Sequence, residues 1–272
     1  MKKLLPPAVL IAMMMLWSAL PGRAELGIAL SPMRIELKIT PGDQYTDALR
    51  ITNDAEDVIR ARGELLDFSI DETMTPQFEP IIEQESKFSC RDWLQVNPME
   101  FELKAEETIR ARYTIRVPAG TPEGEYHCGA GFVSLPPIIK NPTAMGMQIA
   151  VRAVAAIYVY VGEPKSAPKF NGISIKTAPE GTLIAEAAME NQGLRHFRVA
   201  GFMEVKDAAG KIVERMDYPT IPVLPKRVQA FPIQLKTSLP PGTYSLRSQT
   251  DVGLPEILVG NLSFVVEKPA GK

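Results

Sequence analysis

The chain has 272 residues, with 30 Lys or Arg against 32 Asp or Glu, so its formal net charge is −2. This balance excludes the concentrated basic composition of typical nucleic-acid binders, so we expect no nucleic-acid partner. Two His and two Cys are too few for most metal sites and zinc modules. We therefore expect neither a metal nor a cofactor. Apolar residues make up 45% of the chain, which predicts a folded protein.

Residues 1–24 have the composition of a secretory signal peptide. Lys2 and Lys3 precede an apolar run over 4–20, and small residues lie three and one positions before a cut after Ala24. A retained membrane anchor is the alternative, but the run is short for a membrane span. We therefore expect a cleaved signal and an exported mature chain, in a compartment where thiols can pair.

The first half of the mature chain alternates apolar and polar residues in short segments separated by turn residues. This pattern is typical of strands with one buried face. The expected strands span 27–39, 45–52, 58–70, 93–96, 101–103, 108–117, 125–135 and 147–161. Residues 71–88 are polar and contain two prolines, which predicts a long surface loop.

A linker-like segment, 162–168, separates this half from a second series of strands. The expected strands there span 170–177, 182–190, 197–206, 211–217, 227–236, 243–250 and 258–267. The best helix candidate, 185–189, is too short to be stable alone. Short strands at this spacing predict an all-β protein with two immunoglobulin-like β-sandwich domains in tandem. We place these domains at 25–163 and 164–272.

A short internal repeat supports two related domains. Residues 122–126 (PEGEY) and 240–244 (PPGTY) both read Pro-x-Gly-x-Tyr and both begin a strand. In immunoglobulin-like domains a tyrosine at such a corner turns inward, and its hydroxyl bonds back to the upstream backbone. We therefore expect Tyr126 and Tyr244 to form two tyrosine corners.

The two cysteines leave two alternatives open. Cys90 precedes Trp93, and Cys128 lies two residues after Tyr126, so Cys128 and Tyr126 share a strand face. Cys90 comes too late in the chain for the antibody-type bridge. A disulfide between Cys90 and Cys128 would join the end of the 71–88 loop to the core, and two free buried thiols are the alternative.

The sequence offers no enzymatic motif. His127 neighbours Cys128, but adjacent strand residues point to opposite faces, so a nucleophilic Cys–His pair is not expected there. His196 follows a turn-like stretch and is expected to be a surface residue. Serine-hydrolase, zinc-protease and phosphate-loop signatures are missing from the chain. We therefore expect a protein that is not an enzyme and takes no small-molecule substrate.

The first half resembles the periplasmic pilus-assembly (fimbrial) chaperones of the PapD-like family. The resemblance rests on Leu30–Ile35 (LSPMRI), Leu49–Asp54 (LRITND), Trp93–Pro98, the Gly124-x-Tyr126 corner and Met147–Val151 (MQIAV). It covers residues 25–163, while the second half agrees in architecture and in little else. The resemblance implies two immunoglobulin-like domains, a periplasmic location and binding without catalysis.

In this family an edge strand of the chaperone completes the unfinished fold of a pilus subunit. The resemblance assigns that strand to the segment after residue 146, with Met147, Ile149, Val151 and also Ala153 as alternate donor side chains. An ordinary sandwich strand alternates in the same way, so the alternation alone does not identify a donor strand.

The family also anchors the client's terminal carboxylate with an Arg and a Lys in the cleft between the domains. Arg34 occupies the Arg position, and Ala156 occupies the Lys position. Arg152, four residues upstream on the same strand face, is the candidate replacement, although an extended strand places it about 13 Å away. The missing Lys weakens the expectation of a standard pilus-subunit client.

The resemblance implies a chaperone that caps exported pilus or fimbrial subunits by edge-strand donation, with an outer-membrane usher as a further candidate partner. The alternative from the residues is an envelope or cell-surface structural or adhesion protein. A chaperone needs an accessible edge strand, whereas a scaffold protects its edges from aggregation.

Overall fold

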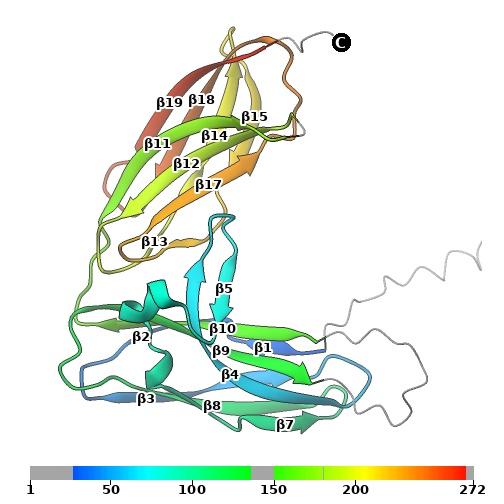
Figure 1. Ribbon diagram of the computed structural model, residues 1–272, viewed down its shortest axis with the longest axis vertical. Coiled ribbons are helices and arrows are strands. Elements are labelled where there is room, and N and C mark those ends of the chain that lie inside the picture. Colours follow the sequence, from blue (N-terminus) through cyan, green and yellow to red (C-terminus); the bar gives the residue numbers. More distant parts are fainter. Residues whose placement is uncertain (1–26, 136–149, 180, 268–272) are drawn as a thin grey trace, which may run out of the picture.

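The computed structural model describes residues 27–135, 150–179 and 181–267. It is an all-β protein of two immunoglobulin-like β-sandwiches that follow one another along the chain (Figure 1). Strands β1–β10 pair among themselves, and strands β11–β19 do the same. The expected signal at 1–24 lies outside the described residues. Within those residues, the structure contains no helix of the length and apolarity that a membrane span needs.

The first domain consists of two facing sheets. One sheet has the order β1 (Ala29–Ser31), β3 (Gln44–Thr52), β8 (Thr108–Arg116) and β6 (Leu94–Asn97). The other has the order β2 (Arg34–Lys38), β10 (Arg152–Val161), β9 (Gly124–Leu135), β4 (Ile59–Ile70) and β5 (Pro76–Glu79), and β7 (Glu100–Leu103) also pairs with β4. The strands expected from alternation are present with ends displaced by a few residues, except that the one expected over 27–39 is divided into β1 and β2, and the start of the one expected over 147–161 lies outside the described residues.

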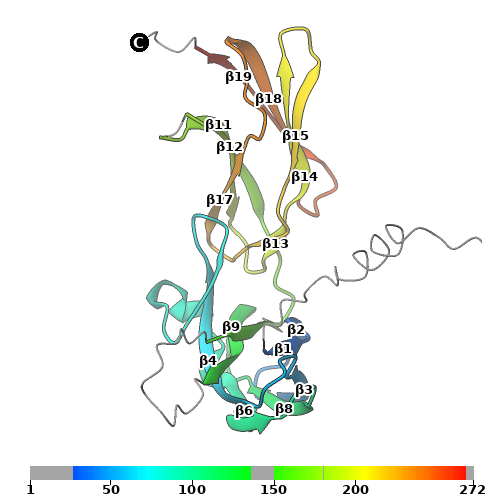
Figure 2. The ribbon, with the colours of Figure 1, turned by 90° about the vertical axis from the view of Figure 1, so that its right-hand side faces the viewer.

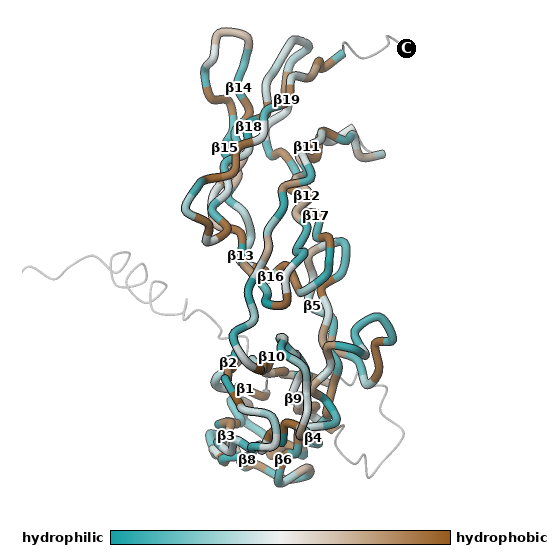
Figure 3. Tube along the Cα trace, turned by 90° about the vertical axis from the view of Figure 1, so that its left-hand side faces the viewer, coloured by the Kyte–Doolittle hydropathy of each residue, from teal (hydrophilic) through white to brown (hydrophobic). Residues whose placement is uncertain are grey.

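Alternation along each strand determines which side chains fill the core between the sheets. In β8, Ala111, Tyr113 and Ile115 are buried, while Arg110, Arg112 and Arg116 on the opposite face are exposed. Hydrophobic and hydrophilic residues alternate along the strands of this domain in Figure 3. The period of two places one apolar face of each sheet against the other.

The chain changes sheets between β1 and β2. β1 pairs antiparallel with β3, and after Pro32 and Met33 the chain continues as β2, which pairs with β10 in the parallel direction. In this register Arg34 lies opposite Ala156, and Lys38 lies opposite Tyr160. β2 therefore covers only the second half of β10.

The segment after β4 is more ordered than the polar loop expected over 71–88. It contains β5, which forms a hairpin with the end of β4, and the 3-10 helix η1 (Glu83–Phe88). A second 3-10 helix, η2 (Arg91–Trp93), follows. Cys90, between the two helices, forms a disulfide with Cys128 of β9, with a Cα–Cα distance of 5.2 Å. The bridge joins this segment to the core.

The second domain also has two main sheets. They are β11 (Pro168–Thr177), β12 (Leu183–Asn191) and β17 (Val228–Gln234), and β15 (Ile212–Asp217), β14 (Ala200–Asp207), β18 (Gly242–Asp251) and β19 (Leu258–Val266). A short pair, β13 (Phe197–Arg198) and β16 (Pro222–Val223), lies beside them. Residues 185–189, the helix candidate, belong to β12, because Ala185, Ala187 and Met189 alternate into the core.

Both tyrosine corners are confirmed. The Tyr126 hydroxyl donates to the carbonyl of Pro122 at 3.1 Å, and the Tyr244 hydroxyl donates to the carbonyl of Pro240 at 2.8 Å. In each domain the bond spans four residues and ties the start of an inner strand to the turn before it. The Pro-x-Gly-x-Tyr repeat therefore marks the same local structure twice.

The β4–β5 hairpin projects from the first domain toward the second (Figure 2). At its tip, the carbonyl of Asp71 accepts a hydrogen bond from Gln229 Nε2 at 3.0 Å, and Met74 packs against the second core. Near its base, Phe68, Tyr158 and Tyr160 of the first domain form a buried apolar cluster with Leu224 of the second. The two sandwiches therefore share an interface with apolar and polar parts.

Candidate binding edge and interdomain cleft

The first half of β10 has one uncovered side. β9 pairs with β10 along residues 152–161, whereas β2 pairs only with residues 156–160. Within the described part of the chain, no strand pairs with residues 152–155 on the side opposite β9. An extended chain could add there as a further strand of the sheet.

The alternation of bonded and non-bonded positions between β9 and β10 shows which backbone groups face this uncovered side. Ser134 N donates to the carbonyl of Val151 at 2.8 Å, and antiparallel pairs alternate between bonded and non-bonded positions. Val151 and Ala153 therefore direct their backbone groups toward β9, while Arg152 and Val154 direct theirs away from it. The first residue bonded on the other side is Ala156, whose N–H donates to the carbonyl of Met33 at 2.9 Å.

The expected donor side chains are only partly described. Met147 and Ile149 lie outside the described residues. Val151 is half-buried, and its N–H donates to Ser134 Oγ at 2.8 Å. Ala153 packs against the first core. The described end of the segment thus has its alternate side chains on the core side of the sheet.

A cleft of about 640 Å³ lies between the domains, beside the start of β2. Arg34 lines it with its side chain 58% exposed, and its Nε lies 3.6 Å from Glu36 Oε1. Because Ala156 is the cross-strand neighbour of Arg34, β10 supplies no cation at that place. The other cations come from the linker and the second domain: Lys165, Arg195 and Arg198.

Arg152 does not replace the missing lysine. Its Nε lies 2.9 Å from Glu64 Oε2, and its Nη1 donates to the carbonyl of Phe78 at 3.1 Å. Both partners belong to the β4–β5 hairpin, and Arg152 does not line the cleft. The expected substitution is therefore wrong, and the second domain supplies the additional cations.

Two tyrosines of β10 orient the cleft arginines. The guanidinium carbon of Arg195 lies 4.4 Å from the ring centre of Tyr160, and that of Arg198 lies 5.9 Å from the ring centre of Tyr158. Burial raises the pKa of Tyr158 to about 12, and burial also raises the pKa of Tyr160. Both rings are neutral at pH 7, and the Tyr160 hydroxyl donates to Glu36 Oε2 at 2.8 Å.

The loop that carries Arg195 is fixed against the first domain and the linker. Leu194 N donates to the carbonyl of Lys165 at 2.8 Å, and Glu125 N donates to the carbonyl of Leu194 at 2.8 Å. The buried amide of Asn191 donates to the carbonyl of Arg195 at 2.8 Å. At Gly193 a Cβ would lie 2.4 Å from the carbonyl oxygen of Lys165, so only glycine permits this close approach.

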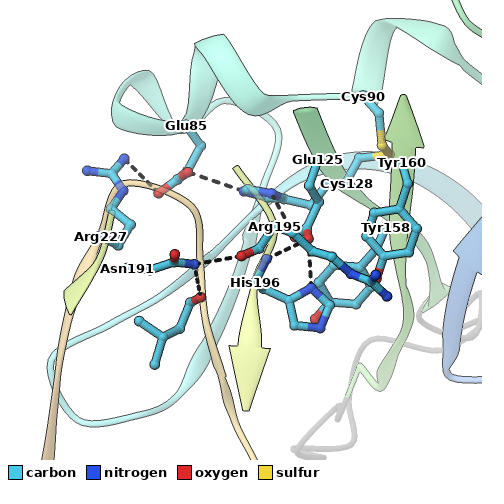
Figure 4. Close-up of polar contacts among 12 residues, drawn as sticks. Glu85, Cys90, Glu125, Cys128, Tyr158, Tyr160, Asn191, Arg195, His196 and Arg227 are labelled. Atoms are coloured by element: carbon cyan, nitrogen blue, oxygen red, sulfur yellow. Dashed lines mark hydrogen bonds and ion pairs between the residues drawn. A yellow bond between two sulfur atoms is a disulfide. The ribbon is translucent and has the colours of Figure 1, made fainter. Parts of the chain in front are cut away.

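A row of ionisable side chains, all buried except the half-exposed Arg227, crosses the domain boundary beside the cleft (Figure 4). Arg227 Nη2 lies 2.7 Å from Glu85 Oε1, and Glu85 Oε2 lies 3.2 Å from His127 Nε2. His127 Nδ1 lies 4.0 Å from Glu125 Oε1, and Glu125 Oε2 lies 2.8 Å from His196 Nδ1. The outer members, Arg227 and His196, belong to the second domain, so the row joins the two sandwiches.

His196 therefore differs from the expected surface residue. It is 9% exposed, and its ring centre lies 4.6 Å from that of Tyr158. His127, which is fully buried, faces η1 and the interface rather than a thiol, because Cys128 points into the core. Within the described ranges, no group of three or more His, Cys, Asp or Glu is arranged to hold a metal ion.

Comparison with known proteins gives structural similarity only. No protein-family model matches the sequence, and no curated protein matches it. Among solved structures, the YadV chaperone aligns over 88% of this chain and all of its own, with 13% identity and a TM-score of 0.48. The Escherichia coli chaperone DraB aligns over 88% and 95% of the two chains, with 16% identity and a TM-score of 0.44.

A third similar structure is the CsuC–CsuE chaperone–tip adhesion subunit pre-assembly complex from archaic chaperone-usher Csu pili of Acinetobacter baumannii. It aligns over 85% of this chain and 97% of the other, with 13% identity and a TM-score of 0.45. These identities and scores are too low to assign a function. The function proposed below rests on the geometry of the chain itself.

Sequence reasoning named Arg34, which lines the cleft, but not the cleft cations of the second domain. Arg195 and Arg198 are separated from Arg34 by more than a whole domain, and only the fold brings them together. The one local sequence signal for these cations is the stretch 195–198 (RHFR), in which two arginines flank His196 and Phe197 directly after a turn.

Proposed function

We propose that this protein is a periplasmic chaperone that binds an exported pilus or fimbrial subunit along the uncovered half of β10. The observation that carries the proposal is the position of the uncovered edge immediately upstream of a cationic cleft. Among the described residues, no strand pairs with 152–155 on the side opposite β9, and Ala156 lies directly opposite Arg34. Edge pairing would supply backbone hydrogen bonds without any catalytic step or cofactor.

The direction of β2 determines the expected direction of the client. β2 runs parallel to β10, and a client strand placed upstream of β2 in the same direction would end beside Arg34. Its C-terminal carboxylate would then enter the cleft lined by Arg34, Lys165 and Arg198. Arginine is suited to this role because its planar fork binds a carboxylate through two hydrogen bonds.

The anchor can be tested with a synthetic peptide of alternating apolar residues, prepared with a free C-terminal carboxylate and as the C-terminal amide. We expect the amide to bind at least about tenfold more weakly, as expected for loss of a charge-assisted hydrogen bond. Arg34→Ala and Arg198→Ala should weaken the binding of the free acid and leave the binding of the amide unchanged. Arg60→Ala is the matched control, since Arg60 is a half-exposed arginine of β4 paired with Glu102 at 3.4 Å.

The edge can be tested separately with two substitutions at one position. Arg152→Pro and Arg152→Ala both remove the contact with Glu64, but only proline also removes the N–H on the uncovered side. We expect capture of the peptide to be lost with proline and retained with alanine. The proposal would be contradicted if the acid and the amide bound equally well and if Arg152→Pro bound the peptide as well as Arg152→Ala does. That result would favour an envelope or cell-surface structural or adhesion protein.

A further inference from the structure

The outer face of the sheet β1–β3–β8–β6 carries four arginines: Arg50, Arg110, Arg112 and Arg116. All four are exposed, and they alternate with the buried residues of β3 and β8. The other outward positions of these strands are threonine, glutamine, asparagine, serine or alanine. Figure 1 shows β3 and β8 in the layer of the first sandwich farthest from the second domain. This surface, called the arginine face below, therefore forms one end of the molecule.

The arginine face lacks the carboxylates that accompany most other arginines among the described residues, although Arg195, Arg198 and Arg247 also have none within 4.0 Å. Among the described residues, none of the four has a carboxylate oxygen within 4.0 Å. Seven other arginines do have such a partner: Arg34, Arg60, Arg62, Arg91, Arg152, Arg215 and Arg227. Positive charge is thus concentrated on one face of a chain whose formal net charge is −2.

The arrangement of these arginines works against folding stability. Arg50 lies directly opposite Arg110 in the β3–β8 register, and like charges at opposed positions of a sheet are destabilising. Arg116 is held outward by neutral partners, since its Nε donates to Gln44 Oε1 at 2.9 Å and its Nη1 donates to Gln95 Oε1 at 2.8 Å. A bound anion would relieve the repulsion, which indicates a role in binding.

The opposed arginines also border a shallow hollow of about 240 Å³, which includes Ser31 and Asp47. Asp47 is the one carboxylate among the described residues that line it, and its Oδ1 accepts a hydrogen bond from Ala48 N at 2.7 Å. The guanidinium groups and the Ser31 hydroxyl are the donors that a phosphate group requires. The hollow has room for a single phosphate.

We propose that the arginine face docks onto an anionic phospholipid surface. The outward side chains rise from a sheet with about 5 Å between strands and about 7 Å between alternate residues, so the cations form a broad array suited to a layer of headgroups. The face carries no outward apolar side chain larger than alanine for insertion, and its attraction to the membrane is electrostatic. β10 lies in the opposing sheet, so docking leaves the client-binding edge accessible.

The test measures co-sedimentation of the full chain with vesicles of phosphatidylglycerol and phosphatidylcholine, against vesicles of phosphatidylcholine alone. The apolar run at 4–20 is common to every variant, so the difference between the two vesicles reports the anionic contribution. We expect binding to anionic vesicles that is lost at high salt. Each arginine replaced should weaken it by about fivefold, as expected for one basic residue at an anionic surface.

The decisive variant is Arg50→Gln/Arg110→Gln, with Arg60→Gln/Arg62→Gln as the control of equal charge change on β4. The first pair should lose anionic binding without a lower melting temperature, because it removes a like-charge contact. The control should bind as the unchanged chain does. If the first pair unfolds, Arg112→Gln alone takes its place.

Three results would overturn the proposal. The first is equal binding to both vesicles, and the second is equal loss in the two double variants. The third is displacement from vesicles by millimolar inorganic phosphate at constant ionic strength, which would assign the hollow to free phosphate. An acidic protein partner in place of a membrane would appear as the first result.

Discussion

Glu125 of the first domain and His196 of the second make two contacts through one carboxylate oxygen. Glu125 Oε2 accepts a hydrogen bond from His196 N at 2.8 Å and lies 2.8 Å from His196 Nδ1. Glu125 is fully buried, and an unpaired carboxylate there would lose its hydration without compensation. The contact therefore ties the position of the Arg195–Arg198 segment to β9.

Replacing Glu125 should loosen the interface between the domains. Because Glu125→Ala removes the buried carboxylate that contacts His196 N and Nδ1, we expect the free energy of unfolding to fall by about 3–5 kcal/mol. Glu125→Gln keeps an acceptor for His196 N and should cost about 1–2 kcal/mol. Urea denaturation monitored separately in each domain would measure both effects. A glutamine variant as stable as the unchanged chain would show that the charge of Glu125 contributes nothing.

The disulfide between Cys90 and Cys128 closes a loop of 38 residues. Chain entropy predicts that a crosslink over this separation stabilises the fold by about 4 kcal/mol. Cys90→Ala/Cys128→Ala should therefore lower the free energy of unfolding by about that amount, and reductant should destabilise only the unchanged chain. Mass spectrometry of non-reduced protein would check the bond directly, since two free thiols add two hydrogens.

Local pattern carried the prediction of this fold a long way. The strands and the two tyrosine corners follow from alternation and turn residues, whereas the disulfide between Cys90 and Cys128 was one of two alternatives that the sequence left open. These features depend on contacts within one domain. Pattern failed where a residue's surroundings come from the other domain, as for His196 and the 71–88 segment, whose hairpin and 3-10 helix contact the second domain through Asp71 and Glu85.

The binding cleft shows the same division. Arg34 was found because its strand has a recognisable sequence, and Arg152 was misassigned because sequence distance along β10 does not reveal the partner of a side chain. The register that opposes Arg34 to Ala156, and the loop that brings Arg198 over Tyr158, are set by tertiary pairing. No local propensity encodes either relationship.

The two tyrosine corners offer a matched test of equivalent bonds in the two domains. Tyr126→Phe and Tyr244→Phe each remove one hydroxyl donor to a proline carbonyl four residues upstream. We expect each to lower the free energy of unfolding of its own domain by about 0.5–1.5 kcal/mol. Thermal denaturation of both variants and of the double variant would give the values. Losses that are not additive would mean that the corners are coupled across the domains.

Tyr158 makes alkaline stability a probe of the domain interface. Burial raises the pKa of Tyr158 from 10.0 to about 12, although Arg198 opposes the shift. Since the folded pKa lies above the unfolded value, this contribution to stability is fully present below about pH 10. It is lost as the pH rises toward 12, by about 1.4 kcal/mol per pH unit.

Tyr158→Phe keeps the ring beside Phe68 and Leu224 and removes the titrating hydroxyl. We expect the free energy of unfolding to decline less steeply between pH 10 and pH 12 in this variant, as measured by urea denaturation at each pH. Tyr218→Phe is the matched variant in the second core, because burial also raises the pKa of Tyr218 to about 12. If Tyr158→Phe left the slope unchanged while Tyr218→Phe reduced it, the Tyr158 hydroxyl would be solvated, and the interface around Leu224 would be open in solution.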